Sequence, residues 1–216
     1  RDGGRGATRK RHWARDGLVV GQTALALVLL IGSGLLVRSF WALRSVDPGY
    51  DTRDLFTFQI APEGKHLPDG PAYARFDLQF MDRLRALPGV ETVGLVENIP
   101  LNEGTTSLRF RVEGAPAEAD GGTLLRMTWA AGDYFKAMGI DVLAGRPFDN
   151  DDHLVPRHHV VVSKSAAALL WPGQDAIGKR VLRQGLTQPY TVIGVVADVM
   201  QNNFRERANP LVYYPL

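Results

Sequence analysis

The dominant feature of the hydropathy pattern is an uninterrupted apolar run near the start of the chain. From Gly17 to Val37 there are 21 residues without a charge, close to the ~20 that a helix needs to cross a hydrocarbon core of about 30 Å. The run predicts a transmembrane helix over residues 17–38. The alternatives are a cleaved signal peptide, whose apolar part usually spans only about 7–15 residues, and a buried core helix, which is rarely apolar on every side.

Beyond this run, short strands and helices alternate in the pattern. Apolar residues recur at steps of three and four over 73–87, which predicts a helix that ends at Pro88 and Gly89. Strict alternation predicts a strand over 108–112, with 123–129 as its neighbour. Further strands are expected at 55–60, 90–96, 160–162, 179–183, 190–196 and 211–214, a helical turn at 134–138, and a helix at 163–171 capped by Ser163 or Ser165. This mixture predicts an α+β fold that opens with a strand, helix and strand crossover unit.

Charges on the two sides of the apolar run predict its orientation. Residues 1–16 carry six Lys or Arg against two Asp, whereas Arg38, Arg44 and several acidic residues follow the run. Basic residues are enriched on the cytoplasmic side of membrane helices. We therefore expect a basic cytoplasmic tail over 1–16, a stalk or linker over 39–54, and an extracytoplasmic domain after it.

Composition excludes several classes of protein. The 216 residues are 45% hydrophobic and 22% charged, which is typical of a globular chain. Without cysteine, neither a disulfide scaffold nor a thiolate metal site can form. The net charge of +2 comes from the tail, because 19 basic and 21 acidic residues remain outside it. We expect no nucleic-acid partner, since such proteins concentrate basic residues on a folded face.

Small residues form a stripe along the predicted membrane helix. Gly17 and Gly21 are a small-xxx-small pair, and Ala24 and Gly32 continue the stripe, where another helix could approach closely. These four are our candidate helix-packing residues. The alternative is that glycine is simply common in membrane helices.

One segment approaches a phosphate-binding loop without meeting its requirements. Residues 173–180 contain a Gly-rich stretch that ends in Lys179, but Arg180 follows where a hydroxyl should hold Mg²⁺. A helix also precedes the first glycine, whereas a P-loop follows a strand. We interpret the segment as a turn between a helix and a strand, with Gly173 past the helix end.

Acidic residues and histidines do not form a recognisable site in the sequence. Adjacent carboxylates at 149–153 rarely converge on one ion, and the glycine and glutamate of a calcium loop are missing, so a solvated loop is expected. The chain has no Gly-x-Ser-x-Gly elbow, although a triad could still assemble in space. We expect no catalytic, cofactor-binding or metal-binding residues. Gly145 and Arg146 are interpreted as a structural turn whose guanidinium bonds carbonyls or a carboxylate, with a partner contact as the alternative.

Eight motifs in a specific order resemble a known family. They occupy residues 18–30, 38–40, 46–51, 87–90, 132–140, 143–148, 171–179 and 192–199, and include Gly-Asp-Tyr-Phe-Lys-Ala-Met-Gly-Ile and Val-Ile-Gly-Val-Val-Ala-Asp-Val. Each motif alone is weak, and their order is specific. Over nearly its whole length, the chain resembles the MacB-like and FtsX-like permeases of bacterial ABC transporters, especially their duplicated orphan-permease branch.

The resemblance implies one N-terminal transmembrane helix followed by a two-lobed α+β periplasmic core domain over 55–216. Its inner lobe would combine residues 55–99 and 189–216, and its outer lobe residues 100–188. Further membrane helices are implied beyond Leu216, so we expect the sequence to be a piece of a longer permease. The motif residues to which we assign a structural role are Tyr134, Phe135, Gly139, Gly145, Arg146, Phe148, Gly178, Gly194, Val195 and Asp198.

The function implied by the resemblance is that of a non-enzymatic permease subunit in the bacterial inner membrane. A separate cytoplasmic ATP-binding-cassette ATPase would use ATP, so this chain needs no cofactor, and the membrane helix would pass motion to the periplasmic domain for efflux or other extracytoplasmic work. Expected partners are membrane lipid, the ATPase, further permease helices in a dimer or pseudo-dimer, and a periplasmic or outer-membrane protein. Two rival functions stay open: a single-pass extracytoplasmic binding or sensor module, and a membrane-anchored hydrolase.

Overall fold

The computed structural model describes residues 6–61, 70–101, 105–116, 122–201 and 210–216. The chain divides into two compact units, one up to Val46 and one from Asp47 to Leu216. The first unit is helical and the second is a mixed α+β domain, as the sequence predicts.

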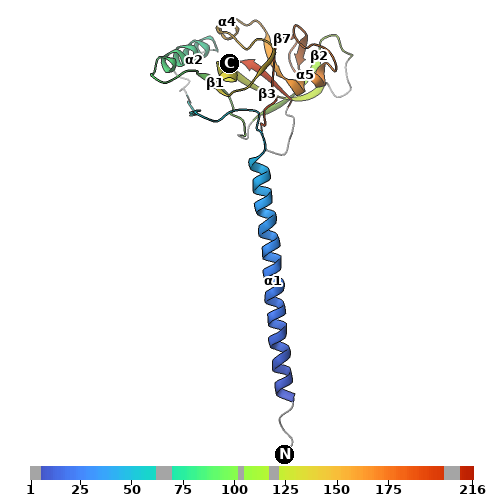
Figure 1. Ribbon diagram of the computed structural model, residues 1–216. Coiled ribbons are helices and arrows are strands. Elements are labelled where there is room, and N and C mark those ends of the chain that lie inside the picture. The colour runs from blue at the N-terminus through green and yellow to red at the C-terminus, as the bar shows by residue number, and fades with distance from the viewer. Residues whose placement is uncertain (1–5, 62–69, 102–104, 117–121, 202–209) are drawn as a thin grey trace, which may run out of the picture. The chain divides into compact units, whose positions relative to one another are not determined.

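The first unit consists of α1 (Gly6–Arg44), a continuous helix of 39 residues (Figure 1). At 1.5 Å per residue it is about 58 Å long. Residues 15–44 contain an apolar window and are long enough to cross a membrane, and none of that window is buried. The helix exceeds the predicted span because the flanking residues favour helix and no proline occurs before Pro48.

The second unit is built on one sheet to which all eight described strands belong (Figure 1). The strands are β1 (Gly94–Val96), β2 (Thr106–Val112), β3 (Thr123–Gly132), β4 (Val142–Gly145), β5 (His159–Ser163), β6 (Arg180–Arg183), β7 (Tyr190–Val196) and β8 (Leu211–Pro215). The helices of this unit are α2 (Gly70–Arg85), α3 (Tyr134–Ala137), α4 (Asn150–Leu154) and α5 (Lys164–Leu170).

Strand pairing closes the sheet into a ring. The order runs β3, β2, β6, β7, β5 and β8, and β8 returns to pair in parallel with β3. β3 can hold two neighbours on one edge because it has ten residues, so β1 pairs with its last part and β2 with its first part. β4 pairs with β7 in the same way. Closure of the ring leaves few unpaired backbone groups at strand edges.

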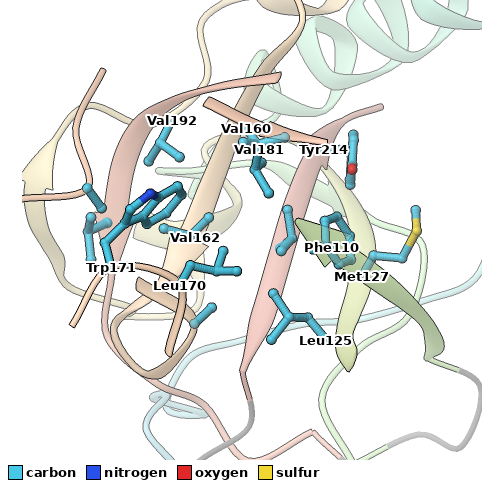
Figure 2. Packing of buried hydrophobic residues seen from close by; sticks show 14 residues of the cluster. Phe110, Leu125, Met127, Val160, Val162, Leu170, Trp171, Val181, Val192 and Tyr214 are labelled. Atoms are coloured by element: carbon cyan, nitrogen blue, oxygen red, sulfur yellow. The ribbon is translucent and has the colours of Figure 1, made fainter. Parts of the chain in front are cut away.

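The largest apolar cluster is formed by alternating residues of the ring strands. Phe110 of β2, Val162 of β5 and Val181 of β6 are fully buried, and α5 contributes Leu170. Figure 2 shows these side chains converging with Trp171, which directly follows α5. The alternate residues of the same strands face a second cluster, which contains Val161, Leu211 and Tyr213 together with residues of α3.

Most predicted elements are confirmed. The helix predicted to end at Pro88 is α2, the two alternating segments are the antiparallel pair β2 and β3, and the helical turn is α3. Ser163 caps α5, since its side chain accepts a hydrogen bond from the Ala166 amide. The last predicted strands are β5, β6, β7 and β8.

The predicted opening crossover unit is wrong. Residues 55–60 form no strand, and only 94–96 of the predicted strand 90–96 are paired. Phe56 and Phe58 are 83% and 54% exposed, and Phe58 contacts Phe80 of α2 with ring centroids 6.2 Å apart. Strand propensity measures how well a residue fits a paired, half-buried surface. Without a neighbouring strand, the alternating sequence of 55–60 stays irregular.

Strand β4 and helix α4 were not predicted. β4 has four exposed residues and α4 has five residues, so neither gives a periodic apolar signal. The predicted lobes share the sheet, because β7 and β8 from the proposed inner lobe pair with β5 from the proposed outer lobe. The lobe boundaries themselves stay a prediction.

Candidate functional site: anchorage of the connecting segment

The residues that follow the apolar helix in sequence are fastened to the domain by backbone hydrogen bonds. We call residues 47–51 the connecting segment. The Met200 amide donates to the Pro48 carbonyl at 2.9 Å, and the Asp51 amide donates to the Met138 carbonyl at 2.8 Å. These two bonds tie the connecting segment both to the chain after β7 and to the end of α3.

Gly49 lies where the chain passes closest to the domain. Its φ of +80° is in the left-handed region that glycine adopts freely, and its amide donates to Oδ1 of Asp47 at 2.9 Å. A Cβ at this position would lie 2.3 Å from the carbonyl oxygen of Asp198. Any side chain at residue 49 would therefore push the connecting segment away from the domain.

Asp198, one of the predicted motif residues, joins this region to α5. Its Oδ1 accepts hydrogen bonds from the Ser165 amide at 2.9 Å and from the Ser165 hydroxyl at 2.6 Å. Hydrogen bonds to an ionised carboxylate are shorter and stronger than bonds between neutral groups. Asp198 thus links two contacts: its backbone carbonyl faces Gly49, and its side chain bonds the first turn of α5.

The predicted aromatic residues Tyr134, Phe135 and Phe148 belong to one buried cluster. The Phe135 ring lies edge-to-face on Tyr213 at 4.9 Å, 5.3 Å from Tyr134 and 6.4 Å from Phe148. Tyr50 of the connecting segment packs against this cluster. Burial raises the pKa of Tyr134, with a smaller contribution from Tyr50, so its hydroxyl stays neutral.

Gly139 supports the other end of the connecting segment. Its φ is +64°, and a Cβ there would lie 3.0 Å from the Cβ of Asp51. The Asp51 carboxylate in turn bonds the exposed Arg53 guanidinium at 2.7 Å. Hydrogen bonds from the Arg53 side chain and amide lower the pKa of Asp51 to about 2, so this end of the segment remains charged at neutral pH.

Two predicted glycines allow two backbones to cross at close range. A Cβ on Gly145 would lie 2.1 Å from the Ile193 carbonyl oxygen, and a Cβ on Gly194 would lie 2.3 Å from the Arg146 carbonyl oxygen. The Arg146 amide donates to the Ile193 carbonyl at 3.0 Å. This crossing fastens the chain after β4 to β7. The predicted residue Val195 directly follows Gly194, is 9% exposed and belongs to the core.

Arg146 bonds a carbonyl and a buried carboxylate. Its guanidinium donates to the Pro147 carbonyl at 2.9 Å and to Asp152 at 2.6 Å. His159 Nδ1 lies 2.7 Å from the other Asp152 oxygen, and the Asp149 amide donates to Asp152 at 3.0 Å. Burial alone would raise the pKa of Asp152, but these hydrogen bonds outweigh it and hold the pKa well below its usual range.

The Asp152 and His159 pair is the arrangement that the hydrolase alternative would need. Among the described residues, His159 bonds only to Asp152, and no nucleophilic side chain completes a triad with it. No group of three potential metal ligands occurs in the described ranges. The pair instead holds α4 against the start of β5.

The near-P-loop segment is a turn between a helix and a strand. α5 ends at Leu170, Gly173 follows with a φ of +70°, and β6 begins at Arg180. The Gly178 amide donates to the Val192 carbonyl at 2.8 Å, and the Lys179 side chain donates to Gln174. The predicted residue Gly178 therefore shapes this turn, with a φ of +77°.

The predicted small-residue stripe lies on α1. A Cβ added at Gly17, Gly21 or Gly32 would meet no atom within 4 Å. Ala24 is likewise on an exposed part of the helix. Packing of the stripe against another helix stays a prediction.

Comparison with known families assigns the chain to one of them. A family profile described as the MacB-like periplasmic core domain matches residues 17–216. The chain belongs to the MacB-like periplasmic core domain family. This result confirms the resemblance identified from the eight motifs and the α+β domain that follows the apolar helix. MacB-like domains are parts of ABC-type transporter permeases. A comparison with functionally described proteins finds no match.

Three solved structures are similar to this MacB-like chain. The periplasmic region of MacB from Actinobacillus actinomycetemcomitans is 20% identical, with a TM-score of 0.44 over 64% of this chain and 54% of that one. The extracellular domain of the noncanonic ABC-type transporter YknZ from Gram-positive bacteria is 23% identical, with a TM-score of 0.43 over 63% and 60%. A domain of a putative permease protein from Porphyromonas gingivalis is 20% identical, with a TM-score of 0.41 over 62% and 54%. The chain thus covers little more than half of each of these structures.

Sequence reasoning missed the anchoring role of Gly49 and the buried position of Asp152. Gly49 was part of motif 46–51, where a glycine after Pro48 signals a turn, but its partner Asp198 is remote in sequence. Asp152 was assigned to a solvated loop, whereas its side chain is fully buried. Its burial depends on Arg146 and His159, whose convergence no local pattern indicates.

Proposed function

We propose that this chain is the first membrane span and the periplasmic domain of an ABC-type permease, and that it transmits motion between them. Its family membership supports the permease assignment. The motion would originate from ATP hydrolysis on a separate cytoplasmic ATPase, and this chain would hold no cofactor of its own. The complete transporter, rather than this chain alone, would determine the transported substrate or other extracytoplasmic work.

The observation that carries the coupling role is the anchorage of the connecting segment. Residues 47–51 begin three residues after the end of α1 in sequence, so a displacement of the span has to pass through them. Their bonds to Met138 and Met200 would carry a pull into the chain after β7 and the end of α3. From there the Asp198 and Ser165 bonds lead to α5. A loosely attached linker would absorb the same displacement by rotating its backbone.

The proposed topology places residues 1–16 in the cytoplasm, α1 in the inner membrane and the domain in the periplasm. The positive-inside rule supports this orientation. Reporters that are active on only one side of the membrane, fused after Arg15 and after Leu216, test it directly. A cytoplasmic Leu216 would overturn the topology. A complete reading frame with further hydrophobic spans after Leu216 would support the permease, and a stop codon there would contradict it.

The coupling role is tested by comparing Gly49→Ala with Gly114→Ala in the complete permease with its ATPase. Both glycines have a φ of +80°, so both substitutions strain the backbone equally. Only Gly49 has a close neighbour, because a Cβ at Gly114 would meet nothing within 4 Å. Spin labels on Arg44→Cys and Ser107→Cys, in a chain without other cysteines, report the distance between the helix end and the domain.

We expect an ATP-dependent change in the distance between the two labels in the parent and in Gly114→Ala. In Gly49→Ala this change should be lost or become broadly distributed, while ATP hydrolysis by the ATPase continues. An unaltered ATP-dependent distance change in Gly49→Ala would refute transmission through the anchorage.

A further inference from the structure

A groove of about 600 Å³ opens on the domain at a place that shares no residue with the anchorage. It is lined by the end of β2 at 110–113, the end of α5 at 169–171 and the turn at 178–180. These three segments come from separate parts of the chain. The pairing of β2 with β6 joins two of them, and the end of α5 packs into the same apolar cluster as Phe110. The groove is therefore a fixed feature of the ring rather than a gap in one loop.

The groove collects positive charge that the described part of the domain does not neutralise. Arg111, Lys179 and Arg180 line it together with one carboxylate, Glu113, which is paired with Arg180 at 3.2 Å. Within the described ranges, Arg111 has no ion pair or side-chain hydrogen bond, and Lys179 bonds only the uncharged Gln174. Two cations thus have no carboxylate partner among the described residues.

Other cations of the domain are neutralised by carboxylates. Arg85, Arg146 and Arg157 each form an ion pair with an aspartate. The chain outside residues 1–16 also contains more acidic than basic residues. Unneutralised cations that share one concave surface raise the local concentration of anions and guide their binding.

The same groove offers apolar surface, and its wall contains a buried hydrogen-bond donor. Leu169 is 53% exposed at its edge, while Phe110 and Trp171 lie buried beneath it. Trp171 is 3% exposed, and its indole N–H is buried without a hydrogen-bond partner in the described structure. A buried donor without a partner is costly.

We propose that this groove binds an extended acidic segment with interspersed apolar residues, supplied by another extracytoplasmic protein. Carboxylates would pair with Arg111 and Lys179, and an apolar side chain would cover Leu169. The open shape favours an extended segment over a small molecule, because small-molecule sites usually bury 70–90% of their ligand. The proposal depends on the proposed function only for the compartment in which the partner is found.

The test uses the whole chain in a non-ionic detergent and a short fluorescein-labelled peptide of alternating aspartate and leucine. Fluorescence anisotropy should show saturable binding that weakens as salt is added. Arg111→Gln and Lys179→Gln should each raise the dissociation constant about threefold or more, and the double variant at least about tenfold. Leu169→Glu should abolish binding, because it places a negative charge beside the peptide.

Arg75→Gln is the matched control, since Arg75 is an exposed cation on α2 outside the groove. It should bind the peptide like the parent, and circular dichroism should show that all variants are folded. Equal binding of a lysine and leucine peptide, or full binding by the double variant, would overturn the proposal. So would succinate that competes as well as the peptide, because this would identify a small-anion site. The binding assay contains no ATPase, so its result does not depend on whether the chain transmits motion from the membrane to the domain.

Discussion

The two apolar regions of the chain contain the same kinds of side chain and present them in opposite ways. On α1, Leu27, Val28 and Leu30 are 54%, 65% and 70% exposed. In the domain, consecutive valines of β5, at 160–162, are all fully buried. Contiguous exposed apolar surface of this extent is not stable in water. The comparison indicates that α1 needs an apolar environment from outside this chain, whereas the domain supplies its own.

The difference originates in how each region satisfies the hydrogen-bonding groups of its backbone. A helix forms its hydrogen bonds within one segment, so α1 can expose every side chain to lipid and remain complete. A strand needs neighbours, and the domain meets this need by closing six strands into a ring. Closure creates two apolar clusters on the two faces of β5, because successive residues of a strand face opposite sides.

The largest expected effect is on the interior of the ring. Phe110→Ala should lower the free energy of unfolding of the domain by about 3–5 kcal/mol, because it leaves a cavity at a fully buried position. Phe56→Ala is the matched control, since Phe56 is 83% exposed and its loss should change stability by less than about 0.5 kcal/mol. Denaturant titration followed by tryptophan fluorescence measures both. Equal losses would contradict the assignment of the interior.

The next effect distinguishes an exposed surface that faces lipid from one that faces water. Leu27→Arg should disfavour membrane insertion by about 2.5–3.5 kcal/mol, the cost of an arginine at the centre of a span. Leu124→Arg on β3 is the control, because Leu124 is 58% exposed, close to the 54% of Leu27. An insertion assay and membrane fractionation should detect only the first substitution. If both variants insert equally well, the exposed surface of α1 does not face lipid.

The two regions also differ in how much of them the sequence could predict. The span depends on one local property, an apolar run of sufficient length, and the run indeed lies within α1. Strands such as β2, β5 and β7 also carry local alternation or apolar runs, and they were found. The family was identified because its eight motifs are spread over residues 18–199, and the family profile matches residues 17–216.

What could not be predicted depends on contacts between remote segments. Ring closure requires β3 to pair with β8, about 85 residues later in the sequence. Residues 55–60 have a strand pattern, but no neighbouring strand pairs with them. Burial of Asp152 likewise requires Arg146 and His159 to meet it from two other segments. Local patterns report what a segment can form, and only tertiary contacts decide whether it does.

The smallest of the three effects concerns a buried charged residue in the domain. The apolar part of α1, from Gly17 to Val37, contains no charged residue. Asp152→Asn should cost about 1–3 kcal/mol at neutral pH, because the hydrogen bonds from Arg146 and His159 lose their charged acceptor. Asp151→Asn is the control, since Asp151 is 63% exposed and pairs with Arg157 at the surface.

The same variant predicts a pH dependence with a definite sign. The pKa of Asp152 is lower in the folded state than its ordinary value of 3.8, so its contribution to stability is fully present above that value. It is lost as the pH falls through the folded-state pKa. The difference in unfolding free energy between the parent and Asp152→Asn should therefore be constant at neutral pH and shrink in acid. A difference that persists unchanged at low pH would mean that packing, rather than a paired buried charge, makes Asp152 stabilising.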